Sequence, residues 1–358
     1  MRSNKVPDET EIVAQELNIP WSIEFSPEGV LYFTERTGTL NKLENDLKTP
    51  LLNLKVSAKK NNESGLLGLA FSPNYSQNHF LYLYYTYSED RATKNRVSRF
   101  RETENNIIEE KIIIDNIPGA RVHNGGRIKF GPDNHLYITA GEIWERERAQ
   151  NLKDLGGKIL RITEEGEIPK DNPWKDSPIY SYGNRNPQGL AWHPITGALF
   201  SSEHGPSGEQ SGWRANDEIN IIMPGGNYGW PRVYGSGSDP EFIDPLIFTG
   251  DDTWAPSGIC FYTGDKISEW KNCLLVANLR GNHLKVVHLK TPQYISVEKI
   301  ETYYHNVLGR LRDVQVGPDG NLYLCTSNTD GRGQPNHYDD LILRIVDPPQ
   351  PDSSLLYD

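Results

Sequence analysis

The chain has 358 residues, and its 37 basic against 48 acidic side chains give a formal net charge of −11 at neutral pH. A surface of this sign repels nucleic acid and anionic membranes, so neither is expected as a partner. The hydrophobic content of 36% is low, yet 18 Tyr, 8 Trp and 10 Phe supply enough large side chains for a core and exclude a disordered chain. The 32 Gly and 24 Pro follow no collagen period and favour short elements joined by tight turns.

No apolar run near the N-terminus resembles a secretory signal, and no stretch is long and apolar enough to span a bilayer. The three cysteines, Cys260, Cys273 and Cys325, have neither CxxC nor His-paired spacing, which argues against zinc and dithiol redox sites. We expect buried free thiols, although the sequence leaves a disulfide between Cys260 and Cys273 open.

One phrase recurs along the chain: an apolar strand, a turn rich in Pro, Gly, Asn or Asp, and a second apolar strand. Its six copies read IEFSPEGVLYFT, LAFSPNYSQNHFLYLYYT, IKFGPDNHLYITA, LAWHPITGALFSS, ICFYTGDKISEWKNCLLVA and VQVGPDGNLYLCT. Their anchor residues are Phe25, Phe71, Phe130, Trp192, Phe261 and Val316. Each copy predicts an antiparallel hairpin, and helical patterns are nearly absent.

Successive anchors are 46 to 69 residues apart, which leaves room for two further strands in each copy. We therefore predict an all-β fold, a six-bladed β-propeller of four-stranded antiparallel blades. The propeller would be a single domain over residues 1–358, with its core at about 12–346 and short tails. A stack of sandwich domains is the alternative, but no linker separates the copies. The longest connection is expected between about Glu203 and Trp254.

In a propeller, the start of each inner strand and the end of its hairpin partner lie at the same mouth of the central channel. Polar and aromatic residues concentrate at this register. Before the anchors they are Trp21, Glu63, His123, Asn124, Arg185, Asn186, Gln188, Trp254, Arg310 and Arg312. After the anchors they are Glu35, Arg36, Glu142, Glu203, His204, Gly205 and Asn328. Convergent polar groups at the mouth of a closed β fold are typical of a ligand site.

The charged residues at this register indicate a reactive site for an anion. His123 shares the register with three arginines, which favours a catalytic base over a structural histidine. Arg310 and Arg312 alternate with Leu311 and therefore point to one face. With Arg185 nearby, these guanidinium groups would repel one another unless an anion lies between them. We therefore expect an acidic ligand inside an acidic protein.

Two other features leave their roles open. Trp21 and Trp254 either pack at the rim of the channel or stack on a flat ligand. Asp217 and Glu218 lie among Gly/Pro turns in EHGPSGEQSGWRANDEINIIMPGGNYGWP, a composition suited to calcium. The string matches no EF-hand loop, and by itself it is better interpreted as solvated turn carboxylates.

The same residues lie in strings that resemble the soluble pyrroloquinoline quinone (PQQ) dependent sugar dehydrogenases, and more closely their aldose sugar dehydrogenase branch. These strings are NGGRIKFGPD after His123, GNRNPQGLAWHP, SEHGP, DEIN followed by GGNYGWP, APSG, and GRLRDVQVGPDGNLY. They occur in order from about Pro20 to Ile345, so the resemblance covers nearly the whole chain.

The resemblance implies PQQ- and calcium-dependent oxidation of the anomeric carbon of aldoses, mono- or oligosaccharides, to lactones. It assigns His123 as the general base for the anomeric hydroxyl, with hydride passing to the quinone, and Arg185 as the group that stabilises developing negative charge. The cofactor-binding residues it implies are Glu63, Arg185, Asn186, Gln188, Trp254, Ser257, Arg280, Arg310 and Arg312. Its calcium ligands are the carbonyls of Gly205 and Pro206 at the cofactor, and Glu218 and Tyr228 at a structural site.

Two positions depart from the glucose-oxidising branch, which has Asp at Val122 and Gln at His204. The aldose branch shares both changes. They therefore leave the preferred sugar open, but they do not argue against PQQ binding. Val122 also removes a carboxylate that would raise the basicity of the neighbouring His123. The loop over residues 207–216 is longer than in the glucose branch, which would alter sugar access.

A dehydrogenase of this kind needs an external electron acceptor, a cytochrome or a quinone. A calcium-dependent lactonase-type hydrolase is an alternative that keeps His123 but leaves the arginines without a purpose. A non-catalytic propeller binding module is another, and it predicts loss of His123 or Arg185. Export of relatives implies an extracytoplasmic location, periplasmic or secreted. A monomer and a homodimer both remain open.

Overall fold

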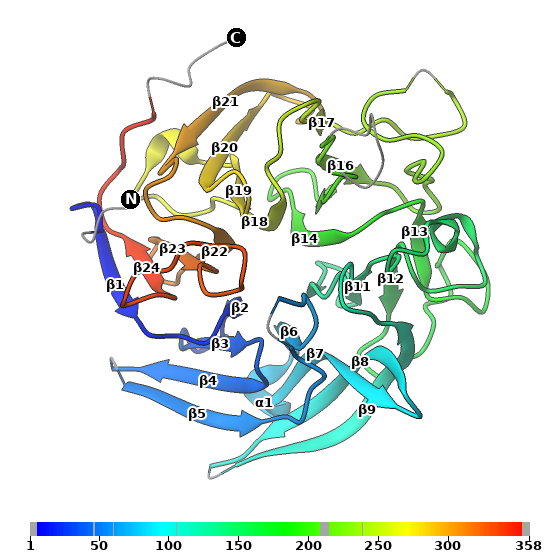
Figure 1. Cartoon of the computed structure of the whole chain (residues 1–358), viewed down its shortest axis with the longest axis horizontal. Helices are drawn as coiled ribbons and strands as arrows, with labels where there is room; N and C mark the ends of the chain where they lie inside the picture. The colour runs from blue at the N-terminus through cyan, green and yellow to red at the C-terminus, as the bar shows by residue number, and fades with distance from the viewer. Residues whose placement is uncertain are drawn as a thin grey trace.

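The computed structural model describes residues 6–45, 47–59, 61–104, 106–207, 215–237 and 239–352. Within these ranges, 24 strands form six four-stranded antiparallel sheets arranged in a ring (Figure 1). Helix is limited to α1 (Tyr75–Asn78) and two 3-10 turns, η1 (Arg146–Gln150) and η2 (Ser268–Trp270). The prediction of an all-β, six-bladed propeller is confirmed.

The first five blades follow chain order, each from its inner to its outer strand. The first is β2 (Pro20–Phe25), β3 (Leu31–Glu35), β4 (Thr39–Glu44) and β5 (Leu47–Asn53). The second is β6 (Leu66–Phe71), β7 (Phe80–Glu89), β8 (Ala92–Glu102) and β9 (Ile107–Pro118). The third is β10 (Ile128–Phe130), β11 (Leu136–Ala140), β12 (Lys158–Ile162) and β13 (Ile179–Tyr182). The fourth is β14 (Pro187–Trp192), β15 (Leu199–Glu203), β16 (Glu218–Ile222) and β17 (Ile247–Phe248). The fifth is β18 (Pro256–Phe261), β19 (Leu274–Asn278), β20 (His283–Leu289) and β21 (Val297–Tyr303).

The sixth blade combines both ends of the chain, which the sequence did not predict. Its order is β22 (Leu311–Val316), β23 (Leu322–Thr326), β24 (Ile342–Ile345) and β1 (Thr10–Ala14). In the β1/β24 ladder, Thr10 pairs with Ile345 and Ile12 with Leu343. The outer strand of the sixth blade therefore comes from the N-terminal segment, and the β1/β24 ladder joins the two ends of the chain within one blade.

Each of the six anchor residues is the last residue of an inner strand. Phe25, for example, ends β2 and pairs with Leu31, and Trp192 ends β14 and pairs with Leu199. The inner strands contact one another around the ring, β2 with β6 and β22 and β14 with β18. The repeat therefore gave the correct register, and the polar starts of these strands gather at one mouth of the channel.

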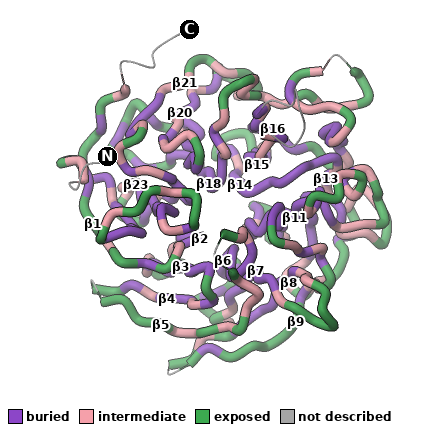
Figure 2. The backbone as a smooth tube through the Cα atoms, viewed as in Figure 1, coloured by how far each residue is buried: buried purple, intermediate pink, exposed green. Residues whose placement is uncertain are grey.

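The core lies between the blades. Inner strands such as β6 are buried throughout, whereas the outer strands β5 and β9 are largely exposed (Figure 2). All three cysteines are buried free thiols, as expected, so the disulfide between Cys260 and Cys273 is not formed. Among the described residues, no helix is long and apolar enough to cross a membrane.

The expected long connection from about Glu203 to Trp254 is not a single loop. It contains β16 and β17, because the fourth blade needs two more strands after its inner hairpin. The predicted long loop over residues 207–216 falls mostly on 208–214, outside the described residues.

Candidate active site at the mouth of the channel

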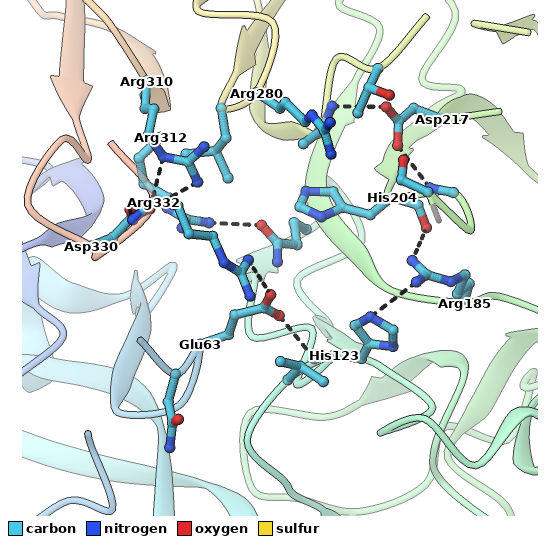
Figure 3. A pocket seen from close by; sticks show the side chains of 18 of the residues that line it. Glu63, His123, Arg185, His204, Asp217, Arg280, Arg310, Arg312, Asp330 and Arg332 are labelled. Atoms are coloured by element: carbon cyan, nitrogen blue, oxygen red, sulfur yellow. Dashed lines mark hydrogen bonds and ion pairs between the residues drawn. The ribbon is translucent and has the colours of Figure 1, made fainter. Parts of the chain in front are cut away.

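A cavity of about 260 Å³ opens where the inner strands begin and their partners end. Every blade contributes to its wall: Arg36 follows β3, Glu63 precedes β6, His123 precedes β10, Arg185 precedes β14, Arg280 follows β19, and Arg310 precedes β22. Figure 3 shows His123, Arg185 and Arg312 facing the same space. The predicted convergence of these distant residues is therefore present.

Cations dominate the wall of this cavity. Within the described part of the chain, its carboxylates are Glu63, Asp217 and Asp330, and its arginines are Arg36, Arg185, Arg280, Arg310, Arg312 and Arg332. The protein as a whole carries a net charge of −11, so this excess of positive charge is local. Clustered guanidinium groups repel one another and are stabilised by a bound anion, which makes an anionic ligand the natural occupant.

His123 is held at three points. Its backbone N–H donates to Oε2 of Glu63 at 2.9 Å, its Nδ1 contacts Oε1 of Glu142, and its Nε2 lies 3.0 Å from Nη2 of Arg185. A guanidinium group can only donate, so Nε2 accepts and Nδ1 carries the proton that is shared with Glu142. Burial and the charge of Arg185 lower the pKa of His123, although Glu142 and Glu63 act in the opposite direction. The imidazole is therefore a neutral base with its lone pair on Nε2.

Glu142 is a carboxylate partner of His123. Val122 removes one carboxylate next to this base, as noted from the sequence. Glu142 supplies one from the end of the hairpin partner, and it is buried with 0% side-chain exposure. The sequence placed Glu142 at the correct register but did not assign it this contact.

Glu63 connects the base to the opposite wall. Besides the backbone of His123, it accepts a hydrogen bond from Nη1 of Arg332 at 2.7 Å. Burial alone would raise the pKa of Glu63, but its interactions with His123, including the backbone N–H of that residue, and with Arg332 lower it. Arg332 was missed by the sequence analysis because it lies in the irregular segment after β23, where no strand period points to it.

Arg312 forms a buried part of the wall. Its Nη1 donates to Oε1 of Gln188 at 2.8 Å and to Oγ of Ser257 at 3.3 Å. Burial lowers the pKa of Arg312 to about 10, and its buried Nε has no partner among the described residues. Neighbouring Arg310 is instead paired with Asp330 through Nε and Nη2, each at 2.9 Å from Oδ2. Of the two, Arg312 therefore has the greater free capacity for a ligand.

Three residues predicted to bind the cofactor do not line the cavity. Asn186 turns its Oδ1 to the backbone N–H of Gly125 at 3.0 Å, and Ser257 lies behind Arg312. The indole Nε1 of Trp254 donates to Asp252 at 3.0 Å, away from the cavity. Asn186 and Ser257 can therefore support the wall, whereas stacking of Trp254 on a ligand is not supported.

Trp21 is also a packing residue. It is 2% exposed, and its ring lies 4.4 Å from the guanidinium of Arg127 and 5.6 Å from that of Arg312. In this structure both indoles pack against protein groups, and neither is among the residues that line the cavity. Trp21 contributes to the site by packing its ring against the guanidinium of Arg312.

All four predicted calcium ligands line one small cavity beside the main one: Gly205, Pro206, Glu218 and Tyr228. Glu203 and Glu218 also line it and face each other across the β15/β16 ladder. Burial raises the pKa of both carboxyl groups. A Cβ at Gly205 would lie 1.9 Å from the carbonyl oxygen of Ala215, so only glycine fits there. No group of three or more His, Cys, Asp or Glu in the described ranges forms a ready metal site.

A family model for glucose/sorbosone dehydrogenases matches residues 17–343. The aldose sugar dehydrogenase YliI of Escherichia coli is 32% identical over 347 residues, 90% of either chain. A putative glucose dehydrogenase from Thermus thermophilus has 45% identity and a TM-score of 0.86, covering 94% of this chain and 98% of its own. The PQQ-bound aldose sugar dehydrogenase of Streptomyces coelicolor has 36% identity and a TM-score of 0.83, covering 96% and 99%. The resemblance read from the sequence is thus confirmed, and the chain belongs to the glucose/sorbosone dehydrogenase family.

Proposed function

We propose that this protein oxidises the anomeric carbon of aldose sugars, mono- or oligosaccharides, to lactones with the help of PQQ and calcium. Its family and the PQQ-bound relative support the cofactor. The single observation that carries the proposal is a neutral base, His123, in a cavity whose arginines outnumber its carboxylates. A hydrolase of the lactonase type would use the base but has no need of the arginines.

The cavity fits PQQ, a planar tricarboxylate, on its chemistry. Arg312 and Arg310 would bind carboxylates of the cofactor, and Gln188 and Ser257 hold Arg312 in place. Buried polar atoms without partners among the described residues also lie here, Nε of Arg312 and Nε2 of His204. Such atoms are costly to leave unpaired, so a polar ligand would satisfy them. Bound PQQ supplies the acceptor for the hydride that leaves the anomeric carbon.

His123 would take the proton of the anomeric hydroxyl at Nε2. In the structure this atom accepts from Arg185, so the hydroxyl would replace Nη2 of Arg185 as the donor. The carboxylate of Glu142 at Nδ1 then stabilises the imidazolium that forms. Arg185, released from the ring but still bonded to the carbonyl of His204 at 2.7 Å, is placed to stabilise negative charge on the reacting oxygen.

Calcium would be held by the carbonyls of Gly205 and Pro206 at the cofactor and by Glu218 and Tyr228 at a structural site, and all four residues line the small cavity. Backbone carbonyls and carboxylates are the oxygen ligands that this cation prefers. Two buried carboxyl groups, Glu203 and Glu218, face each other there, and a divalent cation would neutralise their charge. An external cytochrome or quinone would reoxidise the cofactor, and the proposed location of this chemistry is extracytoplasmic.

Reconstitution tests the proposal. Apoprotein prepared with a chelator should show dye-linked oxidation of aldoses and a shifted PQQ absorbance only after PQQ and calcium are added. His123→Ala should lose turnover by about 10²- to 10⁴-fold and still bind PQQ. His135→Ala, at the turn between β10 and β11, is the matched control and should keep full turnover. Hydrolysis of a lactone without aldose oxidation would instead support the hydrolase.

A further inference from the structure

Trp144 is an exposed indole at the edge of the active-site cavity. It lies just after β11 and lines the cavity, yet 62% of its surface is exposed. Every other tryptophan in the described ranges is buried or half-buried. Single exposed apolar side chains are common on protein surfaces, but this one lines the active-site cavity beside the reactive histidine, where a ligand can cover it.

The backbone holds Trp144 in place at a cost. Ile143 and Trp144 both adopt the left-handed region, with φ of 54° and 65°, which is unfavourable for a β-branched residue and persists only where neighbouring contacts enforce it. The N–H of Trp144 donates to Oε1 of Glu142 at 3.2 Å, and this is the oxygen that contacts His123. One carboxylate therefore contacts both the imidazole of the base and the backbone of Trp144.

The indole lies beside the base and has capacity for a further contact. Its ring centroid is 5.9 Å from that of His123, and the two planes are nearly perpendicular at 87°. No described residue provides a hydrogen-bond partner for the indole Nε1 or a second ring contact. A ligand whose reacting hydroxyl reaches Nε2 of His123 therefore comes within reach of this aromatic surface.

We propose that Trp144 is a sugar-binding residue, on which the C–H face of the aldopyranose ring packs while the anomeric hydroxyl reaches His123. This inference rests on the proposed function. A pyranose suits the position because its C–H groups form an apolar surface and its hydroxyl groups form a polar edge. Arginines of the same cavity, including Arg332, supply donors for those hydroxyl groups. Trp144 would thus determine affinity for the ring, and His123 the chemistry at its anomeric carbon.

The test compares Trp144→Ala, Trp144→Leu and Trp144→Phe in the enzyme loaded with PQQ and calcium. We expect Trp144→Ala to raise KM for the aldose, and the inhibition constant of 1,5-anhydro-D-glucitol, by about tenfold with kcat nearly unchanged. Trp144→Phe should restore most of this affinity and Trp144→Leu less. Leu152→Ala, at an exposed apolar residue outside the cavity lining, is the matched control and should change neither constant.

Three results would overturn the inference: unchanged KM and inhibition constant in Trp144→Ala, a weaker PQQ titration as its main effect, or a lower kcat with a shifted pH profile and unchanged KM. A second readout does not need turnover. 1,5-Anhydro-D-glucitol should change the intrinsic fluorescence of the parent protein but not that of Trp144→Phe. If the parent oxidises no aldose, the proposed function fails, and this fluorescence difference alone decides the role of Trp144.

Discussion

Nε2 of His123 accepts a hydrogen bond from Nη2 of Arg185 at 3.0 Å, while its Nδ1 contacts the carboxylate of Glu142. The two partners act on the imidazole in opposite directions. The cation and burial lower the pKa of His123, and the carboxylate raises it. The basicity of the site is therefore a balance between two side chains that can be changed separately.

Glu142→Gln should reduce kcat on the order of 10²-fold and move the acidic limb of the pH profile to lower pH. The amide still accepts a hydrogen bond but no longer stabilises the imidazolium, so the pKa of His123 falls further. His123 works as the neutral base, so activity is lost as the pH drops through this pKa. The measurement is kcat/KM against pH for the parent and the variant.

Arg185→Gln should move the same limb to higher pH, because it removes the charge that lowers the pKa of His123. The turnover of this variant also falls, because Arg185 no longer stabilises negative charge on the reacting oxygen. The position of the acidic limb is therefore the informative quantity. If the two variants shift the acidic limb in the same direction, Glu142 and Arg185 do not act on the pKa of His123 in opposite directions.

Arg312→Gln should weaken PQQ binding by about 10- to 100-fold, the worth of a charge-assisted hydrogen bond. Arg312 is the better choice than Arg310 because removing Arg310 leaves Asp330 buried without its partner. Absorbance titration of the apoprotein in excess calcium measures the effect. Arg101→Gln, an exposed ion pair with Glu110 on the outside of a blade, is the control. Equal PQQ affinity in both variants would rule out an anchoring role for Arg312.

The fold was predictable because each inner hairpin is local in sequence. Phe25 and Leu31 are close in the chain, so an apolar pattern and a turn suffice to pair them. The ladder between β1 and β24 joins Ile12 to Leu343, and no local pattern encodes a partner so distant. Closure of the ring was therefore visible only in the structure.

The sequence predicted which strand ends carry the site residues, but not which of their side chains point into the cavity. Arg185 and Asn186 are consecutive, and Arg185 lines the cavity whereas Asn186 turns to the backbone of Gly125. Strand starts bring residues near the mouth, but the alternation of neighbours decides which ones face it. The indole of Trp254 likewise turns to Asp252 and does not line the cavity. Trp144 lies beyond the end of β11, where no period applies.

Calcium should raise the Tm of the parent protein, and Glu218→Gln should remove most of that increase. A ligand that binds only the folded state stabilises it in proportion to the logarithm of its concentration over its dissociation constant. Thermal denaturation in excess calcium and in chelator gives the two values for each variant. Glu241→Gln, an exposed carboxylate in the same connection, should respond to calcium like the parent. If both variants keep the full increase, Glu218 is not a calcium ligand.

The ion pair between Arg127 and Asp313 lies next to Trp21 and links residues of different blades at the channel. Both side chains are 1% exposed and 2.8 Å apart, and Oδ2 of Asp313 also accepts the backbone N–H of Ile23 at 3.0 Å. These contacts join the inner strands β22 and β2 to the residue before β10. Loss of one charge would leave the other buried without compensation.

Asp313→Asn should therefore lower the free energy of unfolding by about 3–5 kcal/mol, measured by denaturant titration at fixed PQQ and calcium. Adding Arg127→Met should recover part of this loss, since no charge then remains buried. Glu89→Gln, which breaks the exposed pair with Lys94, should cost less than about 1 kcal/mol. If Asp313→Asn costs no more than Glu89→Gln, the pair does not stabilise this link between the blades.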